Sequence, residues 1–158
     1  MGVRSTSRPG RLAVALILAG LLMSGIVGVR TDANAEERHG RRRHMLALTN
    51  EDRLRRERDQ LSFAERLSRY ARQHSAAMVA RGEILHSSAD QIRQALDGLR
   101  WSLVGENIGV ASSLEDLQGA FMSSKLHRQN ILRPEFSRAT VGVVKADGRL
   151  WVTVIFYG

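Results

Sequence analysis

Cysteine is absent from the 158-residue sequence, proline occurs only twice, and aromatic residues make up 5% of the chain. Without cysteine, disulfide bonds contribute nothing to the stability of the fold. A closed structural zinc site needs four protein ligands, and here no thiolate exists to supply them. The chain must therefore be stabilised by its hydrophobic core, and its length favours a single domain.

Basic residues outnumber acidic ones, 24 to 16, which is one pattern found in nucleic-acid-binding proteins. The arginines are scattered, however, few aromatic residues lie among them, and only the run Arg41–Arg43 is dense. We therefore expect no nucleic-acid partner.

Residues 1–35 have the layout of a secretory signal peptide: a basic start, an uncharged apolar run over residues 12–29, and an A-x-A cleavage site that ends at Ala35. Cleavage there predicts a secreted, extracellular protein. The apolar run is longer than a usual signal core, so an uncleaved membrane anchor formed by residues 12–29 is the alternative. It is also the only membrane attachment that we expect.

Residues 36–44 are interpreted as a basic flexible tail, because they contain no apolar residue to bury. Its two histidines, His39 and His44, are the alternative location for any metal binding. The folded domain is expected over residues 45–158.

Two helices are predicted in the first half of this domain. The first covers residues 45–56, and Asn50 on its apolar face is interpreted as a bridge to the backbone, since a buried amide needs partners. The second runs from Phe63 to Arg81, with Gly82 placed to end it. His74 lies on the apolar stripe of this helix and is interpreted as a core histidine held by hydrogen bonds.

A further helix is predicted between Ser112 and His127. Ser112 is a suitable N-cap, and Glu115 has the spacing of a capping box. Before this helix, residues 103–108 indicate a short buried segment with a turn at Gly105. Glu106 is flanked there by apolar residues, and a buried carboxylate must be paired or become neutral. Glu106 is therefore a better site candidate than the surface acids.

Residues 140–145 and 149–157 are predicted strands, joined by the hairpin signal Asp147-Gly148. Both faces of the last strand are largely apolar, so we expect cover on both sides. Helices first and strands last, with two covered faces, predict an α+β fold. Its form is a three-layer α-β-α sandwich with a C-terminal antiparallel β-hairpin.

Five short motifs follow one another in order along this domain. They are His86-Ser87, Gly105-Glu106-Asn107-Ile108, residues 124–132, residues 141–144 and residues 151–156. In this order and spacing they resemble the CAP superfamily of cysteine-rich secretory, antigen 5 and pathogenesis-related proteins. The similarity is greatest to its short bacterial members, the SCP-like extracellular proteins, and it covers roughly residues 45–158.

The resemblance implies a cleft in which His86 and His127 hold a divalent metal beside Glu106. Two imidazoles suit zinc better than calcium. The second glutamate of the family falls here on Ser124, and Asn130 follows in the same motif. We expect Glu106, Ser124 and Asn130 to line the ligand cleft, and we assign no catalytic residue.

Three functions remain open at this stage. The favoured one is a secreted, monomeric CAP domain that binds a divalent metal, a small apolar ligand or a peptide. The second is a hydrolase, either metal-assisted or using Ser123 or Ser124 with a histidine; the missing second acid and the absent G-x-S-x-G motif disfavour it. The third is a non-catalytic interaction module of the cell envelope, in which the polar residues form a structural network.

Overall fold

The computed structural model describes the backbone of residues 19–158 and the side chains of residues 33–158. The chain divides into two compact units, Met1–Glu36 and Glu37–Gly158, and the second contains the fold described below. The elements in chain order are α1 (Ala19–Leu54), β1 (Ser62–Phe63), a 3₁₀ turn (Glu65–Leu67), α2 (Ser68–Arg81), α3 (Ala89–Ala95), β2 (Val104–Ala111), α4 (Leu114–Ser123), α5 (Lys125–Leu132), β3 (Arg138–Ala146) and β4 (Arg149–Tyr157).

Helix α1 continues through residues 36–44, where a flexible tail is expected from the sequence. Nothing in that stretch breaks a helix, and two contacts support it: Glu37 pairs with Arg41 one turn later, and Arg42 reaches Glu65 at 3.2 Å. The predicted signal peptide (residues 1–35) and the alternative anchor (residues 12–29) fall partly on residues 1–18, which lie outside the described part of the chain. Among the helices that are described, none is both long and apolar enough to cross a membrane.

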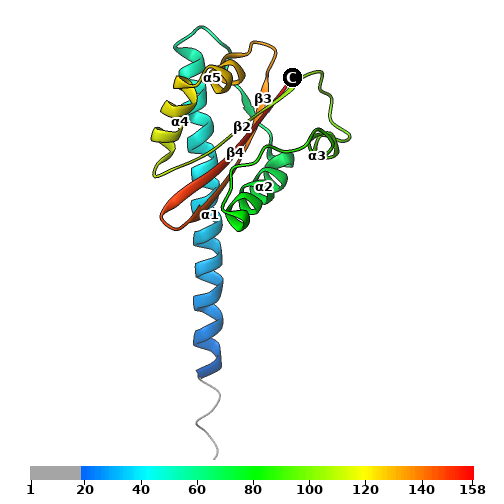
Figure 1. Cartoon of the computed structure of the whole chain (residues 1–158). Coiled ribbons are helices and arrows are strands. Elements are labelled where there is room, and N and C mark those ends of the chain that lie inside the picture. Colours follow the sequence, from blue (N-terminus) through cyan, green and yellow to red (C-terminus); the bar gives the residue numbers. More distant parts are fainter. Residues whose placement is uncertain (1–18) are drawn as a thin grey trace, which may run out of the picture. The chain divides into compact units, whose positions relative to one another are not determined.

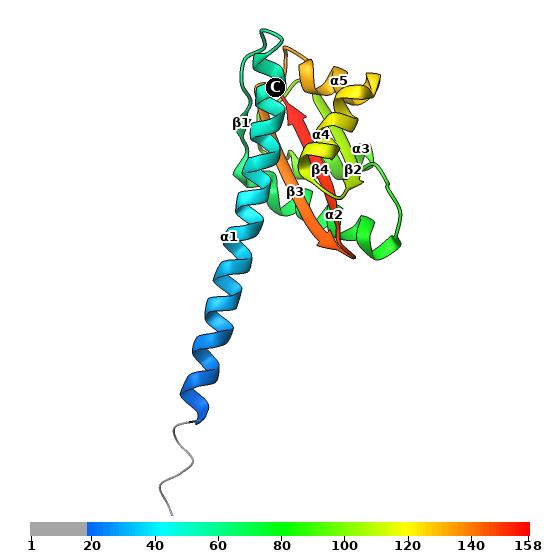
Figure 2. The ribbon, with the colours of Figure 1, turned by 90° about the vertical axis from the view of Figure 1, so that its left-hand side faces the viewer.

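The sheet has four strands in the order β1-β3-β4-β2 (Figure 2). The predicted hairpin is confirmed: β3 and β4 pair antiparallel, and Asp147 and Gly148 between them have φ of 49° and 72°. Positive φ at both central residues is the geometry of a type I′ turn. Strand β2 pairs antiparallel with β4 and forms one edge of the sheet.

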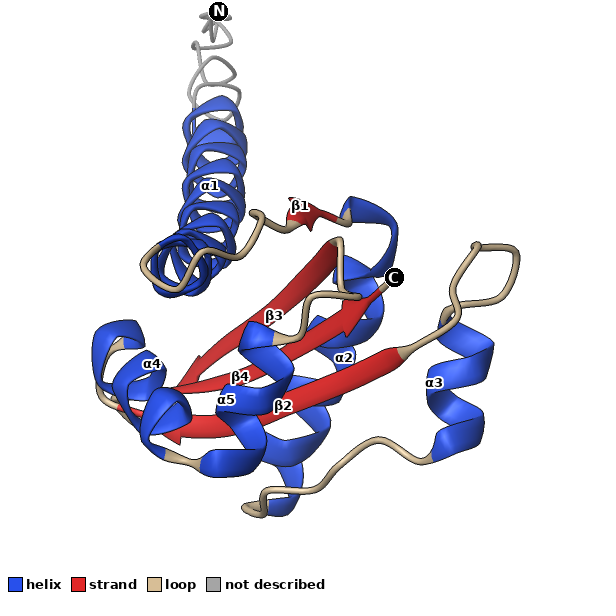
Figure 3. Cartoon of the chain, turned by 90° about the horizontal axis from the view of Figure 1, so that it is seen from above, coloured by secondary structure: helices blue, strands red, loops and turns tan. Residues whose placement is uncertain are grey.

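Helices cover both faces of this sheet, as Figures 1 and 3 show for α2 on one side and α4 and α5 on the other. Along β4, Leu150, Val152, Val154 and Phe156 belong to the core cluster shared with α1, α4 and α5. The residues Ile155 and Tyr157 belong instead to the cluster that includes α2 and α3. The three-layer α-β-α sandwich predicted from the sequence is therefore confirmed.

Helix α2 lies directly against the backbone of β3. A Cβ atom placed on Gly142 would be 2.1 Å from the carbonyl carbon of Ala71, so only glycine permits this approach. The helix starts at Ser68, whereas the sequence predicts a start at Phe63. Residues Ser62 and Phe63 instead form a parallel strand beside β3, and the Ala64 amide donates to the Ala139 carbonyl at 2.8 Å.

The single helix predicted between Ser112 and His127 is two helices. The backbone of Ser124 is extended, with φ −80° and ψ 126°, which ends α4 and begins α5. The N-cap of α4 is Ser113, whose hydroxyl accepts from the Asp116 amide, while the Ser112 hydroxyl donates to the Asp116 carboxylate. His127 therefore lies within a helix, α5, and not in a loop after one.

The bridging interpretation of Asn50 is confirmed. Its amide nitrogen donates to the Leu61 carbonyl at 3.0 Å, and its amide oxygen accepts from the Leu61 N–H at 2.8 Å. This pair of bonds fastens the chain after α1 back onto the helix.

Candidate functional site

Edge strand β2 carries the central residues of the site on its two faces. Glu106 is opposite Ile155 of β4, which faces α2, whereas Asn107 is opposite Val154, which faces α4 and α5. Successive residues of a strand point to opposite faces of the sheet. Because β2 has a neighbour on one side only, groups from both layers can approach its free edge.

No turn occurs at Gly105, contrary to the sequence-based expectation, because this residue lies inside β2. Glycine is needed there for space: a Cβ atom would lie 2.8 Å from the amide oxygen of Asn130 on α5. The Asn130 amide donates to the Glu106 carbonyl at 3.2 Å and to the Asn107 side chain at 2.9 Å. Asn107 in turn donates to the His127 carbonyl at 3.1 Å. Asn130 thus fastens α5 to β2.

Glu106 has only half of its carboxylate satisfied. Its side chain is 9% exposed, and Oε1 accepts from the Ser87 amide at 3.1 Å and lies 2.9 Å from Nδ1 of His86. The other oxygen, Oε2, is buried and has no hydrogen-bond partner among the described residues. The His86 side chain is 62% exposed, so it covers the carboxylate from the solvent side.

His74, which the sequence predicts to be a core histidine, lies near Glu106 and His86. Its Nδ1 lies 3.1 Å from the Thr153 hydroxyl, and its ring stacks on Tyr70 at 6.3 Å between centroids. Burial lowers the pKa of His74, the Glu106 charge opposes this, and the His86 and Arg81 charges lower the pKa further. The predicted hydrogen-bonded role is confirmed, but His74 also lies close enough to Glu106 and His86 to respond to their charges. In the sequence, the one signal for this role is that Tyr70 and His74 lie four residues apart, which places two polar side chains on the same face of α2.

His127 approaches the same edge from α5. Its ring lies 4.9 Å from that of Phe121 between centroids. Burial lowers the pKa of His127, and the charge of His86 lowers it further. The two histidines named by the sequence are therefore electrostatic neighbours, and both effects favour the neutral form of the His127 imidazole. Ser124 marks the break between α4 and α5, and its side chain makes no capping hydrogen bond.

Three buried side-chain oxygens lack a hydrogen-bond partner among the described residues: Tyr70 Oη, Ser87 Oγ and Glu106 Oε2. Burial raises the pKa of Tyr70, the Ser87 hydroxyl at hydrogen-bonding range lowers it, and the Glu106 charge raises it again. The three groups are therefore neighbours, and we call them the Glu106 cluster. The two hydroxyls can pair with each other, whereas Glu106 Oε2 can only accept, so this oxygen is the group of the cluster that lacks a donor.

The described residues contain no group of three His, Cys, Asp or Glu side chains arranged to hold a metal ion. The direct contact between His86 and Glu106 provides two of the ligands that a zinc site requires, and His127 is not within ligand distance of the same point. Of the two serines considered for a hydrolase, Ser123 donates its hydroxyl to the Gly119 carbonyl of its own helix at 2.9 Å. The arrangement therefore supplies a carboxylate acceptor and imidazole rings, without an activated serine nucleophile at Ser123.

Comparison with known proteins gives consistent matches for this domain. The sequence model of the cysteine-rich secretory protein family, CAP, matches residues 46–156. The uncharacterized protein YkwD of Bacillus subtilis is 32% identical over 114 residues, which is 68% of this chain and 43% of that protein.

Two bacterial crystal structures share the fold. An extracellular protein with an SCP domain from Bacillus anthracis has a TM-score of 0.62 and 26% identity, covering 76% of this chain and 41% of its own. A cysteine-rich secretory protein from Staphylococcus aureus has a TM-score of 0.63 and 20% identity, covering 77% of this chain and 39% of its own. The chain therefore spans less than half the length of each of these three proteins.

Proposed function

The chain belongs to the cysteine-rich secretory protein (CAP) family, and from this premise we propose that it is an extracellular binding protein whose ligand is held at the Glu106 cluster. The description of a structural relative as an extracellular protein supports this location. So does the signal-peptide pattern that ends at Ala35.

The observation that carries the proposal is the unpartnered oxygen of a buried carboxylate. An ionised carboxylate only accepts hydrogen bonds, and an unpaired one in a low-dielectric environment is costly. Tyr70, whose pKa responds to the Glu106 charge, and Ser87, whose amide donates to Glu106 Oε1, lie near this carboxylate, but neither hydroxyl donates to Oε2. The ligand that best complements these groups presents N–H donors with a positive charge, such as an amidinium or ammonium group.

A divalent metal such as zinc is the second candidate, favoured by the neutral imidazole of His127 beside His86. The residues do not form a complete metal site in this conformation, because only His86 and Glu106 are in contact. His86 is exposed and would have to turn so that it and His127 face one point. A bound zinc ion would act there as a Lewis acid toward a ligand oxygen.

Two matched probes test the main proposal: benzamidine, which carries a cationic amidinium group, and benzoate, which has the same ring and a negative charge. Calorimetric titration of the full-length protein should detect benzamidine and not benzoate. The variant Glu106→Gln should lose benzamidine binding, whereas Glu83→Gln, at an exposed position just after α2, should keep it. Equal binding of both probes, or of benzamidine by both variants, would show that Glu106 does not hold the ligand.

Zinc titration at about pH 7.5 tests the second candidate, since imidazoles are then neutral. If the metal lies at the candidate site, His86→Ala and His127→Ala should each weaken zinc binding by about tenfold or more. The double variant His39→Ala/His44→Ala is the control. If that control alone loses binding, the metal belongs to α1. If zinc and both probes fail to bind, the remaining function is the envelope interaction module.

A further inference from the structure

A cavity of about 540 Å³ lies along α5 and the loop that follows it. Lys125, Arg128 and Leu132 line it and recur at helical spacing, so they share one stripe of α5. The loop adds Arg133, Pro134 and Glu135. This α5 pocket is distinct from the Glu106 cluster, which contains none of its lining residues.

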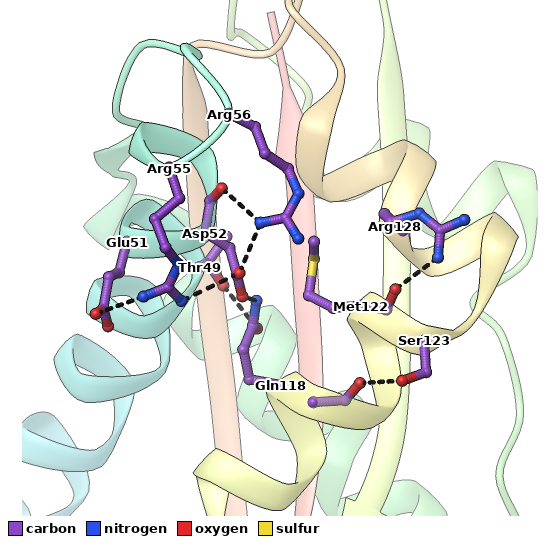
Figure 4. Close-up of polar contacts among 10 residues, drawn as sticks. Thr49, Glu51, Asp52, Arg55, Arg56, Gln118, Met122, Ser123 and Arg128 are labelled. Atoms are coloured by element: carbon purple, nitrogen blue, oxygen red, sulfur yellow. Dashed lines mark hydrogen bonds and ion pairs between the residues drawn. The ribbon is translucent and has the colours of Figure 1, made fainter.

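Three cations line the α5 pocket against one carboxylate. Within the described part of the chain, no acidic side chain pairs with Lys125, Arg128 or Arg133. Arg128 uses one guanidinium nitrogen to donate to the Met122 carbonyl at 2.7 Å, as Figure 4 shows, and this bond fixes its position. The guanidinium of Arg133 lies 5.9 Å from the centre of the Phe136 ring. The arginines are thus held in place while most of their donors stay uncommitted.

The backbone that forms the pocket wall is also held by hydrogen bonds from the buried side of the protein. The buried guanidinium of Arg53 donates to the carbonyls of Ile131, Arg133 and Phe136 at 2.7, 3.0 and 3.2 Å. These bonds hold the end of α5 and the loop in one arrangement. A preorganised site loses less conformational entropy when it binds a ligand.

We propose that the α5 pocket binds a phosphate ester. Arginine forks match the oxygens of a phosphate group, and lysine adds a compact positive charge. Leu132 and Pro134 supply an apolar surface for the organic part of the ester, and the volume lies within the usual range for small-ligand pockets. No aromatic residue lines the pocket, so it offers no platform for stacking the bases of a nucleic acid.

Binding of glycerol 3-phosphate to the full-length protein, measured by calorimetry, tests the proposal. The double variant Lys125→Gln/Arg133→Gln should weaken binding about a hundredfold, because each lost charged hydrogen bond is worth roughly a factor of ten. Glu135→Gln removes the only negative charge of the pocket and should tighten binding. The control Arg69→Gln/Arg72→Gln removes the same charge from exposed positions on α2 and should leave the affinity unchanged.

Sedimentation with phosphatidylcholine vesicles, with and without phosphatidylglycerol, separates the two sources of the ester. Binding of the soluble ester alone identifies a free organic phosphate, and binding that needs phosphatidylglycerol and the α5 cations identifies a lipid headgroup; either result supports the proposal. Equal losses in the α2 control would show only a general response to net charge and would overturn it. The proposal would also be overturned if neither glycerol 3-phosphate nor phosphatidylglycerol vesicles bound. It would be overturned too if a single-stranded oligonucleotide bound more tightly than the ester and the α5 variants abolished that binding. If the double variant does not fold, Lys125→Gln and Glu135→Gln must still shift the affinity in opposite directions.

Discussion

Buried polar side chains occur on both sides of the sheet, and the two sides differ in whether these side chains have hydrogen-bond partners. Between α1 and α4, the Gln118 amide donates to the Asp52 carboxylate at 2.8 Å and accepts from the Thr49 hydroxyl at 3.3 Å (Figure 4). The other carboxylate oxygen of Asp52 accepts from Arg55 and Arg56 at 3.2 and 3.0 Å. The buried side chains of Thr49, Asp52 and Gln118 are therefore paired within the protein.

Between α2 and β2 the matching is incomplete. Tyr70, Ser87 and Glu106 each leave one buried oxygen without a partner in the described chain. Burying such groups costs the same kind of free energy on either side of the sheet. The α1–α4 interface is paired as a stabilising interface would be, and the unpaired oxygen of Glu106 is the basis of our proposal that a ligand binds there.

The largest effect is expected on the matched side, for Arg53→Met. Arg53 is 1% exposed and donates to the carbonyls of Asp59, Ile131, Arg133 and Phe136. Methionine fills much of the volume but leaves those acceptors unpaired, so the free energy of unfolding should fall by about 3–5 kcal/mol. Urea denaturation measures it. Arg55→Met, at an exposed site, should cost far less, and equal losses for both would refute the special role of Arg53.

Gln118→Leu should have an intermediate effect. Leucine removes the donor to Asp52 and leaves a buried carboxylate oxygen unpaired, which should cost about 1–3 kcal/mol at neutral pH. An unchanged denaturation midpoint would mean that the α1–α4 network is not the matched region that the structure indicates.

The same variant should change how stability depends on pH. Burial acts to raise the pKa of Asp52, but the hydrogen bonds from Gln118 and Arg55 and the charges of Arg55 and Arg56 lower it below its ordinary value of 3.8. Asp52 therefore adds stability that is present above the unfolded pKa and is lost as pH falls through the folded pKa. Without Gln118 the two pKa values should move closer together, and this acid-induced loss should shrink. Denaturation curves between about pH 5 and pH 2 would measure it.

The smallest effect on stability is expected for Glu106→Gln. Glutamine keeps an oxygen for the Ser87 amide, and Oε2 has no protein partner to lose. The free energy of unfolding should change by less than about 1 kcal/mol, while the affinity for benzamidine falls. A loss of several kcal/mol with benzamidine affinity intact would place Glu106 among the structural groups and remove the contrast between the two sides.

Local patterns predicted much of the fold. The alternation along β4, the Asp147-Gly148 turn and the bridging role of Asn50 follow from periodicity, turn chemistry and the need to satisfy a buried amide. The end of α2 at Gly82, where φ is 65°, also follows from a single residue, because glycine adopts positive φ readily. Each depends on residues close together in the chain, so the sequence suffices.

Where the prediction failed, distant segments determined the local structure. Ser62 and Phe63 extend the apolar pattern of α2 but form a strand, because the edge of β3 offers backbone partners. Gly105 looks like a turn residue but lies in β2, where its small size admits the Asn130 side chain. Neither partner is visible in the neighbouring residues.

For the site, the sequence proposed His86, Glu106 and His127 as candidates, the two histidines through the family resemblance, and it marked Glu106 as a carboxylate placed among apolar residues. Only the tertiary structure decided what surrounds them. It placed His74 and Tyr70 of α2 beside Glu106, turned Asn130 toward the backbone of β2, and left Oε2 without a partner in the described chain. These relations depend on the register of β2 against β4 and on how α2 and α5 pack across the sheet. Such long-range contacts form only when the whole domain folds, so no local pattern encodes them.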